Sequence, residues 1–330
     1  AQNGTYYYCV ISNNSGSSVE TNRALLTVYY APVITTQPSN VTATATNTAE
    51  FSIGVTNGNP STTNYQWQYR TSSTGTWTNV TSSQGTANGN KFTTVKTTVS
   101  MNGYEYRCII GNSRYPNAVT SNAGKLTVNA KSISATGITA EANPNSYEYT
   151  GSAITLSESQ LVVKDNGTTL KLGTDYTVSY ANNTNVGTAT ITITGKGNYS
   201  GTRAVQFEIT RKPIAIPTKT DYVYNGTERT GVPTGTGYTL EGTAKATKVG
   251  TYTVTVKLDG NHKWFDGTTK DVTLTWNITA KSLNTSDVTV SINPNSYVYT
   301  GSPITPTSNV SVTDSKATIT SSDYDISFSN

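Results

Sequence analysis

Hydrophobic and polar side chains alternate with a period of two along most of the chain. This pattern places successive side chains on opposite faces of a β-strand, whereas an amphipathic helix repeats every 3.6 residues. Clear examples are residues 176–180 (Y-T-V-S-Y), 189–193 (A-T-I-T-I) and 252–256 (Y-T-V-T-V). Asn-Gly, Thr-Gly and Asp-Gly pairs separate such runs and predict tight turns. Since no stretch has a convincing helical pattern, we expect an all-β chain.

The strands belong to repeats, and the first repeat family has a period near 100 residues. Residues 3–9 (N-G-T-Y-Y-Y-C) and 102–108 (N-G-Y-E-Y-R-C) share the pattern N-G-x-x-Y-x-C, 99 positions apart. A period of this size corresponds to one β-sandwich domain. We therefore expect a complete sandwich over residues 32–130, preceded by the C-terminal part of another over residues 1–31.

A second repeat family begins near residue 131. The segment 143–152 (N-P-N-S-Y-E-Y-T-G-S) recurs with one change at 293–302, and a diverged copy carries Y-V-Y-N-G-T at the corresponding place. This spacing predicts three further domains, which cover residues 131–211, 212–280 and, in truncated form, 281–330. Both chain ends fall inside a repeat, so we expect a piece of a longer protein. The linkers are short and two contain proline, which favours a semi-rigid string of domains, a beads-on-a-string rod.

Charge is sparse and scattered. The 330 residues include 23 Lys and Arg against 19 Asp and Glu, a formal net charge of +4, and only 13% of residues are charged. Nucleic-acid binding requires Lys and Arg gathered on one stripe, and no such cluster is present, so no nucleic-acid partner is expected. No apolar run approaches the roughly 18 residues of a membrane span, so this chain predicts no membrane insertion.

The inventory of reactive side chains is equally small. The chain has one histidine, His262, and two cysteines, Cys9 and Cys108. No catalytic motif accompanies them, and the short acidic turns lack the ligand count of a calcium loop. We therefore predict a protein that is not an enzyme and that has no catalytic residues, cofactor or metal site.

Residues 32–130 resemble a bacterial immunoglobulin-like domain. The segment 65–69 (Y-Q-W-Q-Y) is typical of strand C with its core tryptophan, and Tyr106 stands two residues before Cys108, at the tyrosine-corner position of strand F. The resemblance places a strand B residue near position 53 opposite Cys108. Because Ile53 stands there in place of the usual cysteine, we expect Ile53 to fill the core and Cys108 to be free.

Residues 131–330 resemble the tandem immunoglobulin-like repeats of large Gram-positive cell-surface proteins of the adhesin type. The residues that carry this resemblance are the Y-x-Y-[TN]-G-[ST] opening, 172–176 (L-G-T-D-Y) and 185–188 (N-V-G-T). The resemblance implies a string of immunoglobulin-like β-sandwiches in an extracellular location, on the bacterial surface or in the cell wall. It is more specific for architecture than for function, because such repeats serve many roles.

The two cysteines occupy matching positions in successive domains. We expect both to be buried, with Cys9 and Cys108 too far apart to form a disulfide, which needs Cα atoms within ~7 Å. The favoured interpretation is two inert buried thiols. A bridge from Cys9 to strand B of its own domain stays open.

Aromatic residues provide the remaining candidates. Each copy of the second family has a tyrosine pair that either packs across strands or forms a platform for sugars; the pairs are Tyr147/Tyr149, Tyr222/Tyr224 and Tyr297/Tyr299. The segment 259–267 (D-G-N-H-K-W-F-D-G) provides the weak ligand-binding candidates His262, Trp264 and Phe265. The alternative is a structural hairpin with Trp264 folded over the end of the sandwich.

These observations favour a structural stalk or adhesin segment that projects or contributes to a binding module. A second hypothesis is a ligand-binding module for a host glycan or glycoprotein, such as immunoglobulin or mucin. A third is an accessory segment of a large extracellular carbohydrate-active enzyme. As a stalk, the chain is expected to be a monomeric rod.

Overall fold

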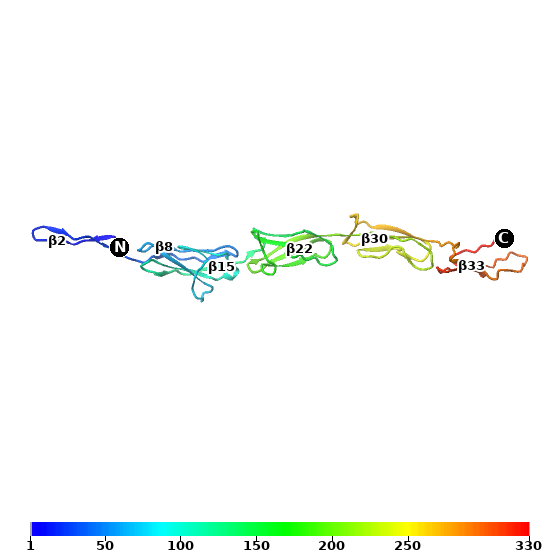
Figure 1. The fold of residues 1–330 in the computed structure, drawn as a ribbon, viewed down its shortest axis with the longest axis horizontal. Coiled ribbons are helices and arrows are strands. Elements are labelled where there is room, and N and C mark those ends of the chain that lie inside the picture. Colours follow the sequence, from blue (N-terminus) through cyan, green and yellow to red (C-terminus); the bar gives the residue numbers. More distant parts are fainter. Residues whose placement is uncertain (1, 330) are drawn as a thin grey trace. The chain divides into compact units, whose positions relative to one another are not determined.

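The computed structural model describes residues 2–329, and it confirms the all-β prediction. β-Strands run from one end of the described chain to the other (Figure 1). Within these residues the helical elements are two short 3-10 turns, η1 (Val99–Met101) and η2 (Thr307–Asn309). No helix in the described part is long and apolar enough to cross a membrane. The chain divides into two compact units: one holds residues up to 142 with 156–180 and 191–205, and the other holds 143–155, 181–190 and 206 onwards.

The first unit contains an immunoglobulin-like sandwich in the predicted range 32–130. One sheet has the order β10-β9-β13-β15-β6, with β14 also paired to β13, and the second has the order β11-β12-β7 beside the pair β5-β8. The strands are β5 (Val33–Thr36), β6 (Val41–Thr44), β7 (Glu50–Ser52), β8 (Gly54–Thr56), β9 (Asn64–Arg70), β10 (Thr78–Asn79), β11 (Gly85–Asn88), β12 (Lys91–Thr94), β13 (Glu105–Gly111), β14 (Val119–Thr120) and β15 (Gly124–Asn129). β6 pairs with β15 in parallel, and the other pairs are antiparallel.

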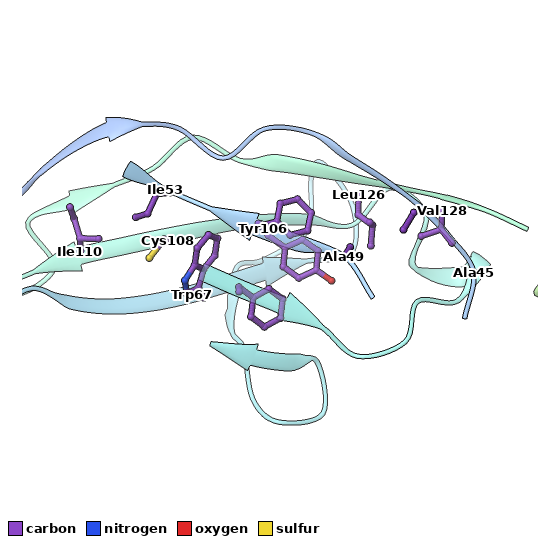
Figure 2. Packing of buried hydrophobic residues seen from close by; sticks show 12 residues of the cluster. Ala45, Ala49, Ile53, Trp67, Tyr106, Cys108, Ile110, Leu126 and Val128 are labelled. Carbon is purple, nitrogen blue, oxygen red and sulfur yellow. The ribbon is translucent and has the colours of Figure 1, made fainter. Parts of the chain in front are cut away.

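The core of this sandwich is built around Trp67 of β9. Trp67, Cys108 and Ile53 belong to one buried cluster between the sheets (Figure 2). Trp67 is fully buried, and its Nε1 donates a hydrogen bond to the Gly89 carbonyl oxygen at 3.1 Å. Ile53 is 2% exposed, so the prediction that it fills the core opposite Cys108 is confirmed.

Tyr106 departs from the expected tyrosine corner. In that arrangement the hydroxyl bonds to backbone a few residues upstream. Here Tyr106 is fully buried between Phe51 and Phe92, with ring centroids at 4.6 and 5.2 Å, and its hydroxyl has no hydrogen-bond partner among the described residues. Burial raises the pKa of this hydroxyl well above its ordinary value. The tyrosine therefore serves as a core aromatic.

Residues 2–31 form two strand pairs that match those of residues 102–128. In the described chain no second sheet packs against them. The strands are β1 (Thr5–Tyr7), β2 (Val10–Ser12), β3 (Ser18–Glu20) and β4 (Ala24–Leu26), paired as β1-β4 and β2-β3. The hydrogen bonds repeat: the Cys9 N–H donates to Thr21 Oγ1 as Cys108 donates to Ser121 Oγ, both at 2.9 Å. Cys9 is nevertheless exposed, so its predicted burial is wrong, because no second sheet covers it here.

The range 131–211 begins with β16 (Lys131–Ser132), which pairs in parallel with β23 (Tyr199–Ser200). In the first unit, β17 (Ile138–Ala142), β19 (Leu161–Asp165) and β20 (Thr168–Thr169) form a sheet. In the second unit, β18 (Ser146–Glu148) pairs in parallel with the end of β24 (Thr202–Thr210). The remaining strands of this range are β21 (Tyr176–Ala181) and β22 (Gly187–Gly195).

A buried ion pair anchors the start of this range. Lys131 Nζ lies 2.6 Å from Asp165 Oδ1, and the Tyr199 hydroxyl donates to Asp165 Oδ2 at 3.0 Å. Both charged residues are less than 9% exposed. A buried carboxylate is tolerated when its oxygens are satisfied in this way. The acidic turn at 165–167 was expected to be explained by turn chemistry, whereas Asp165 ends strand β19 and is engaged by a lysine and a tyrosine.

The range 212–280 lies in the second unit and repeats this plan. β25 (Lys212–Ile214) pairs in parallel with β31 (His262–Trp264), and the main sheet has the order β26-β32-β30-β28. The strands of this sheet and of a smaller pair are β26 (Tyr222–Val223), β27 (Arg229–Thr230), β28 (Tyr238–Gly242), β29 (Lys245–Ala246), β30 (Gly250–Leu258) and β32 (Val272–Thr279). Trp276, Val254, Val232 and Ile278 form the core. Beyond it, β33 (Val288–Ile292) pairs with β34 (Val310–Asp314). The predicted boundaries at 31, 130, 211 and 280 stay predictions.

Candidate functional site

The three predicted ligand-binding residues have different surroundings. Trp264 is 1% exposed, and its Nε1 donates to the Lys270 carbonyl oxygen at 2.8 Å while its ring packs against Tyr238. His262 is also buried, whereas Phe265 is 73% exposed. The alternation along β31 turns the side chains of His262 and Trp264 inward together. The three residues therefore do not form one exposed aromatic surface, and the burial of Trp264 agrees with the structural hairpin.

His262 is held by its neighbours. Its Nδ1 lies 2.6 Å from Asp259 Oδ1, and the Tyr149 ring meets the imidazole edge-on with centroids 5.3 Å apart. Burial alone acts to raise the pKa of Asp259, but hydrogen bonds from His262 and from the Asn261 N–H outweigh it, so the carboxyl pKa is lowered. The single histidine is thus fixed by a carboxylate and an aromatic ring.

Asn261, which lies between Asp259 and His262, makes hydrogen bonds to residues of two neighbouring repeats. Its side-chain Oδ1 accepts a hydrogen bond from the Val186 N–H at 2.9 Å, and its Nδ2 donates to Asn185 Oδ1 at 3.1 Å. Its backbone oxygen accepts from the Lys212 N–H at 3.0 Å. Asn261 thereby joins the preceding predicted domain to the first strand of its own.

Asn198 makes the same connection one domain earlier. Its Oδ1 accepts from the Val99 N–H at 2.8 Å, and its backbone oxygen accepts from the Lys131 N–H at 2.8 Å. The two asparagines are equivalent by topology, because each precedes the strand that pairs in parallel with the first strand of its domain. We call Asn198 and Asn261 the junction asparagines.

The junction asparagines were not predicted from the sequence. The triplets Gly197-Asn198-Tyr199 and Gly260-Asn261-His262 share only two residues, in a chain rich in both glycine and asparagine. Aligning Val186-Gly187-Thr188 with Val249-Gly250-Thr251 reveals the match, because these two triplets and the two asparagines are each 63 residues apart. Its meaning depends on which backbone N–H the asparagine oxygen reaches, and that partner lies 99 residues away in one case and 75 in the other.

In the first two tyrosine pairs, one tyrosine contacts its own sheet and the other contacts the segment that follows. The first tyrosine packs on its own sheet: Tyr147 meets Phe207 edge-on at 5.4 Å, and Tyr222 meets Trp276 edge-on at 6.3 Å. The second reaches the following segment, since Tyr149 contacts His262 and the Tyr224 hydroxyl donates to Asp323 Oδ1 at 3.2 Å. Two of the three pairs therefore pack within the protein; Tyr297 and Tyr299 are exposed.

No metal-binding arrangement is found between residues 2 and 329, since no group of three or more His, Cys, Asp or Glu side chains comes together there. The acidic turns instead make hydrogen bonds of the kind that stabilise turns. Asp323 Oδ2, for example, accepts from the Thr320 N–H and hydroxyl, both at 2.8 Å.

Comparisons with known proteins add little to this description. No protein-family model matches the chain, and no curated protein matches it in sequence. Among solved structures it is similar to a three-immunoglobulin-domain fragment of titin (12% identity, 76% of this chain and 99% of that one, TM-score 0.28). It is also similar to the N-terminal eight immunoglobulin domains of DSCAM (11%, 85% and 41%, TM-score 0.28) and to Sidekick-1 immunoglobulin domains 1–5 (13%, 85% and 67%, TM-score 0.27). TM-scores this low carry no weight, so the fold assignment rests on the strand topology above.

Proposed function

We propose that this chain is a structural, non-enzymatic stalk segment of an extracellular bacterial surface protein of the Gram-positive adhesin type. The bacterial and surface context is supported by the sequence resemblance of residues 32–130 and 131–330. A stalk requires domains that fold independently and connections that resist bending. The separate buried clusters around Trp67 and Trp276 support the first requirement.

The junction asparagines carry the proposal, because their hydrogen bonds support the second requirement. In each junction a single asparagine binds the backbone of the preceding domain through its side chain and the backbone of its own first strand through its carbonyl. Two hydrogen bonds on one residue fix the direction in which the linker leaves. The recurrence of this arrangement at two junctions indicates a regular way of joining domains, which a projecting stalk needs and an isolated binding domain does not.

The test uses the full chain with Asn198→Ala and Asn261→Ala combined. Each side-chain hydrogen bond contributes about 0.5–1.5 kcal/mol. We therefore expect the Val99 and Val186 amides to exchange several-fold faster and small-angle X-ray scattering to report a wider range of end-to-end dimensions. Asn284→Ala is the matched control, because this exposed side chain makes no hydrogen bond among the described residues.

The two outcomes are distinct. Unchanged scattering and unchanged protection of both amides in the double variant would show that the asparagines do not stiffen the junctions. Thermal unfolding of the same variants separates a loosened junction from a destabilised domain, because only the latter lowers the melting temperature of a sandwich.

A further inference from the structure

The outer face of the sheet in the 32–130 sandwich carries a cluster that the stalk does not use. In β9 and β13, Trp67 and Cys108 point into the core, so the alternate residues Arg70 and Arg107 lie on the opposite face. The partly exposed Trp77 lies over them: its ring centroid is 4.6 Å from Arg70 Cζ and 4.2 Å from Arg107 Cζ. Two guanidinium groups thus share one indole.

The two guanidinium groups differ in their charge partners. Arg70 is neutralised by Glu105, whose Oε2 lies 2.7 Å from Nε and 2.5 Å from Nη2. Arg107 donates from Nε to Gln68 Oε1 at 2.9 Å, and within residues 2–329 it forms no ion pair with a carboxylate. Partial burial and the nearby charge of Arg70 lower the pKa of Arg107. Its two Nη groups have no acceptor in the described chain.

The contact with the Trp77 indole is an attractive cation–π interaction. It leaves the Nη groups of Arg107 without an acceptor among the described residues, and an anion that bound there would add charge-assisted hydrogen bonds. The neighbouring side chains are uncharged amides: Gln68 Nε2 donates to Asn79 Oδ1 at 2.9 Å, and Gln66 lies on the same face of β9. Amides both donate and accept, which suits hydroxyl groups.

We propose that this face, defined by Arg70, Trp77, Arg107, Gln68 and Asn79, binds a carboxylate-bearing saccharide. The carboxylate would accept two hydrogen bonds from the Nη groups of Arg107, a bidentate geometry that guanidinium favours. The indole offers an apolar surface to the sugar ring, and the amides reach its hydroxyls. A polyanionic peptide or nucleic acid would need a row of unpaired cations. In the described part of this sheet the outer face offers Arg107 and Lys125, which lies opposite Glu105 on β15.

The test measures binding to the full chain by isothermal titration calorimetry. The probes are sialyllactose and a glucuronate-containing disaccharide, which distinguish the two common sources of a sugar carboxylate, with lactose as the neutral comparison. We expect one or both acidic probes to bind at least about tenfold more tightly than lactose. Equal binding of lactose, or no binding of either acidic probe, would overturn the proposal.

Variants locate the site. Arg107→Gln is expected to weaken binding of the acidic probe at least about tenfold, and Arg107→Lys to recover only part of it, because lysine lacks the bidentate fork. Lys91→Gln is the matched control, since it removes the same charge from the other sheet, where Lys91 pairs with Glu50 at 2.8 Å. Equal losses in both variants, or displacement of the sugar by polyglutamate, would show a non-specific charge effect and refute the saccharide site. If Arg107→Gln lowers the melting temperature, Trp77→Phe tests the same face.

Discussion

Gly231 gives the sharpest test of the packing in the 212–280 range. A methyl group added at this glycine would lie 1.8 Å from Trp276 Cδ2 and 2.2 Å from Cε2. The indole cannot move aside freely. It is fully buried, its Nε1 donates to the Thr243 carbonyl oxygen at 2.8 Å, and the Tyr252 ring packs on it at 4.9 Å. Gly231→Ala must therefore displace the central residue of the core.

The expected cost follows from these contacts. Overpacking a core costs about 1–3 kcal/mol, and weakening the Trp276 hydrogen bond adds about 0.5–1.5 kcal/mol. The loss of backbone freedom in the unfolded chain offsets roughly 0.4–1 kcal/mol. The net destabilisation is therefore about 0.5–4 kcal/mol, which lowers the melting temperature of a domain of this size by on the order of 2–30 °C.

Calorimetry of the full chain measures this shift, and hydrogen exchange localises it to peptides of β30 and β32. Gly260→Ala is the control, because the space around its added methyl group is empty within 4 Å. We expect it to melt close to the unsubstituted chain. A Gly231→Ala variant as stable as Gly260→Ala would mean that Trp276 is not packed against Gly231 as described.

Three further predictions concern the cysteines and Asp259. Burial raises the pKa of the Cys108 thiol to about 12, so a thiol reagent at pH 8 should modify the exposed Cys9 alone in the native chain and both cysteines after denaturation. Ile53→Cys should restore the usual bridge to Cys108, seen as the loss of two hydrogens in intact mass and about 2–4 kcal/mol of added stability on oxidation. Because the folded-state pKa of Asp259 lies below 3.8, its contribution is present above that pH and is lost as the pH falls further. Asp259→Asn should therefore be less stable than the unsubstituted chain near neutral pH, and the difference should vanish in acid.

The residues on the inner faces of the strands could be predicted, because buried positions are hydrophobic at every second residue of a strand. Trp67, Ile53 and Cys108 could be assigned to one core from spacing and from the resemblance, and they share one buried cluster. For Tyr106, burial could be predicted but the surroundings of its hydroxyl group could not. Its position fixed its burial, but the partner of its hydroxyl depends on loop geometry that the spacing does not encode.

The candidate sites escaped prediction for a physical reason. A core residue is recognised by its own hydrophobicity. Asn261 and Arg107 have their proposed roles because of contacts with residues distant in sequence, Val186 and Trp77. Trp77 follows β9 in a turn where it resembles any other loop aromatic. Predicting that it lies over two arginines requires both the strand register, which pairs Arg70 with Glu105, and the path of the turn.

The proposed stalk role and the proposed saccharide binding depend on different residues of a sandwich domain. Core packing occupies the inward residues of each strand and leaves the outward residues free to vary at little cost in stability. The junction asparagines lie outside the sheets, immediately before β23 and β31, while Arg107 lies on the outer face of β13. Because these groups share no contacts, substitutions at one should leave the other unchanged. A repeated stalk domain can thus acquire a binding face without losing its junctions, so the stalk and binding hypotheses do not compete for the same residues.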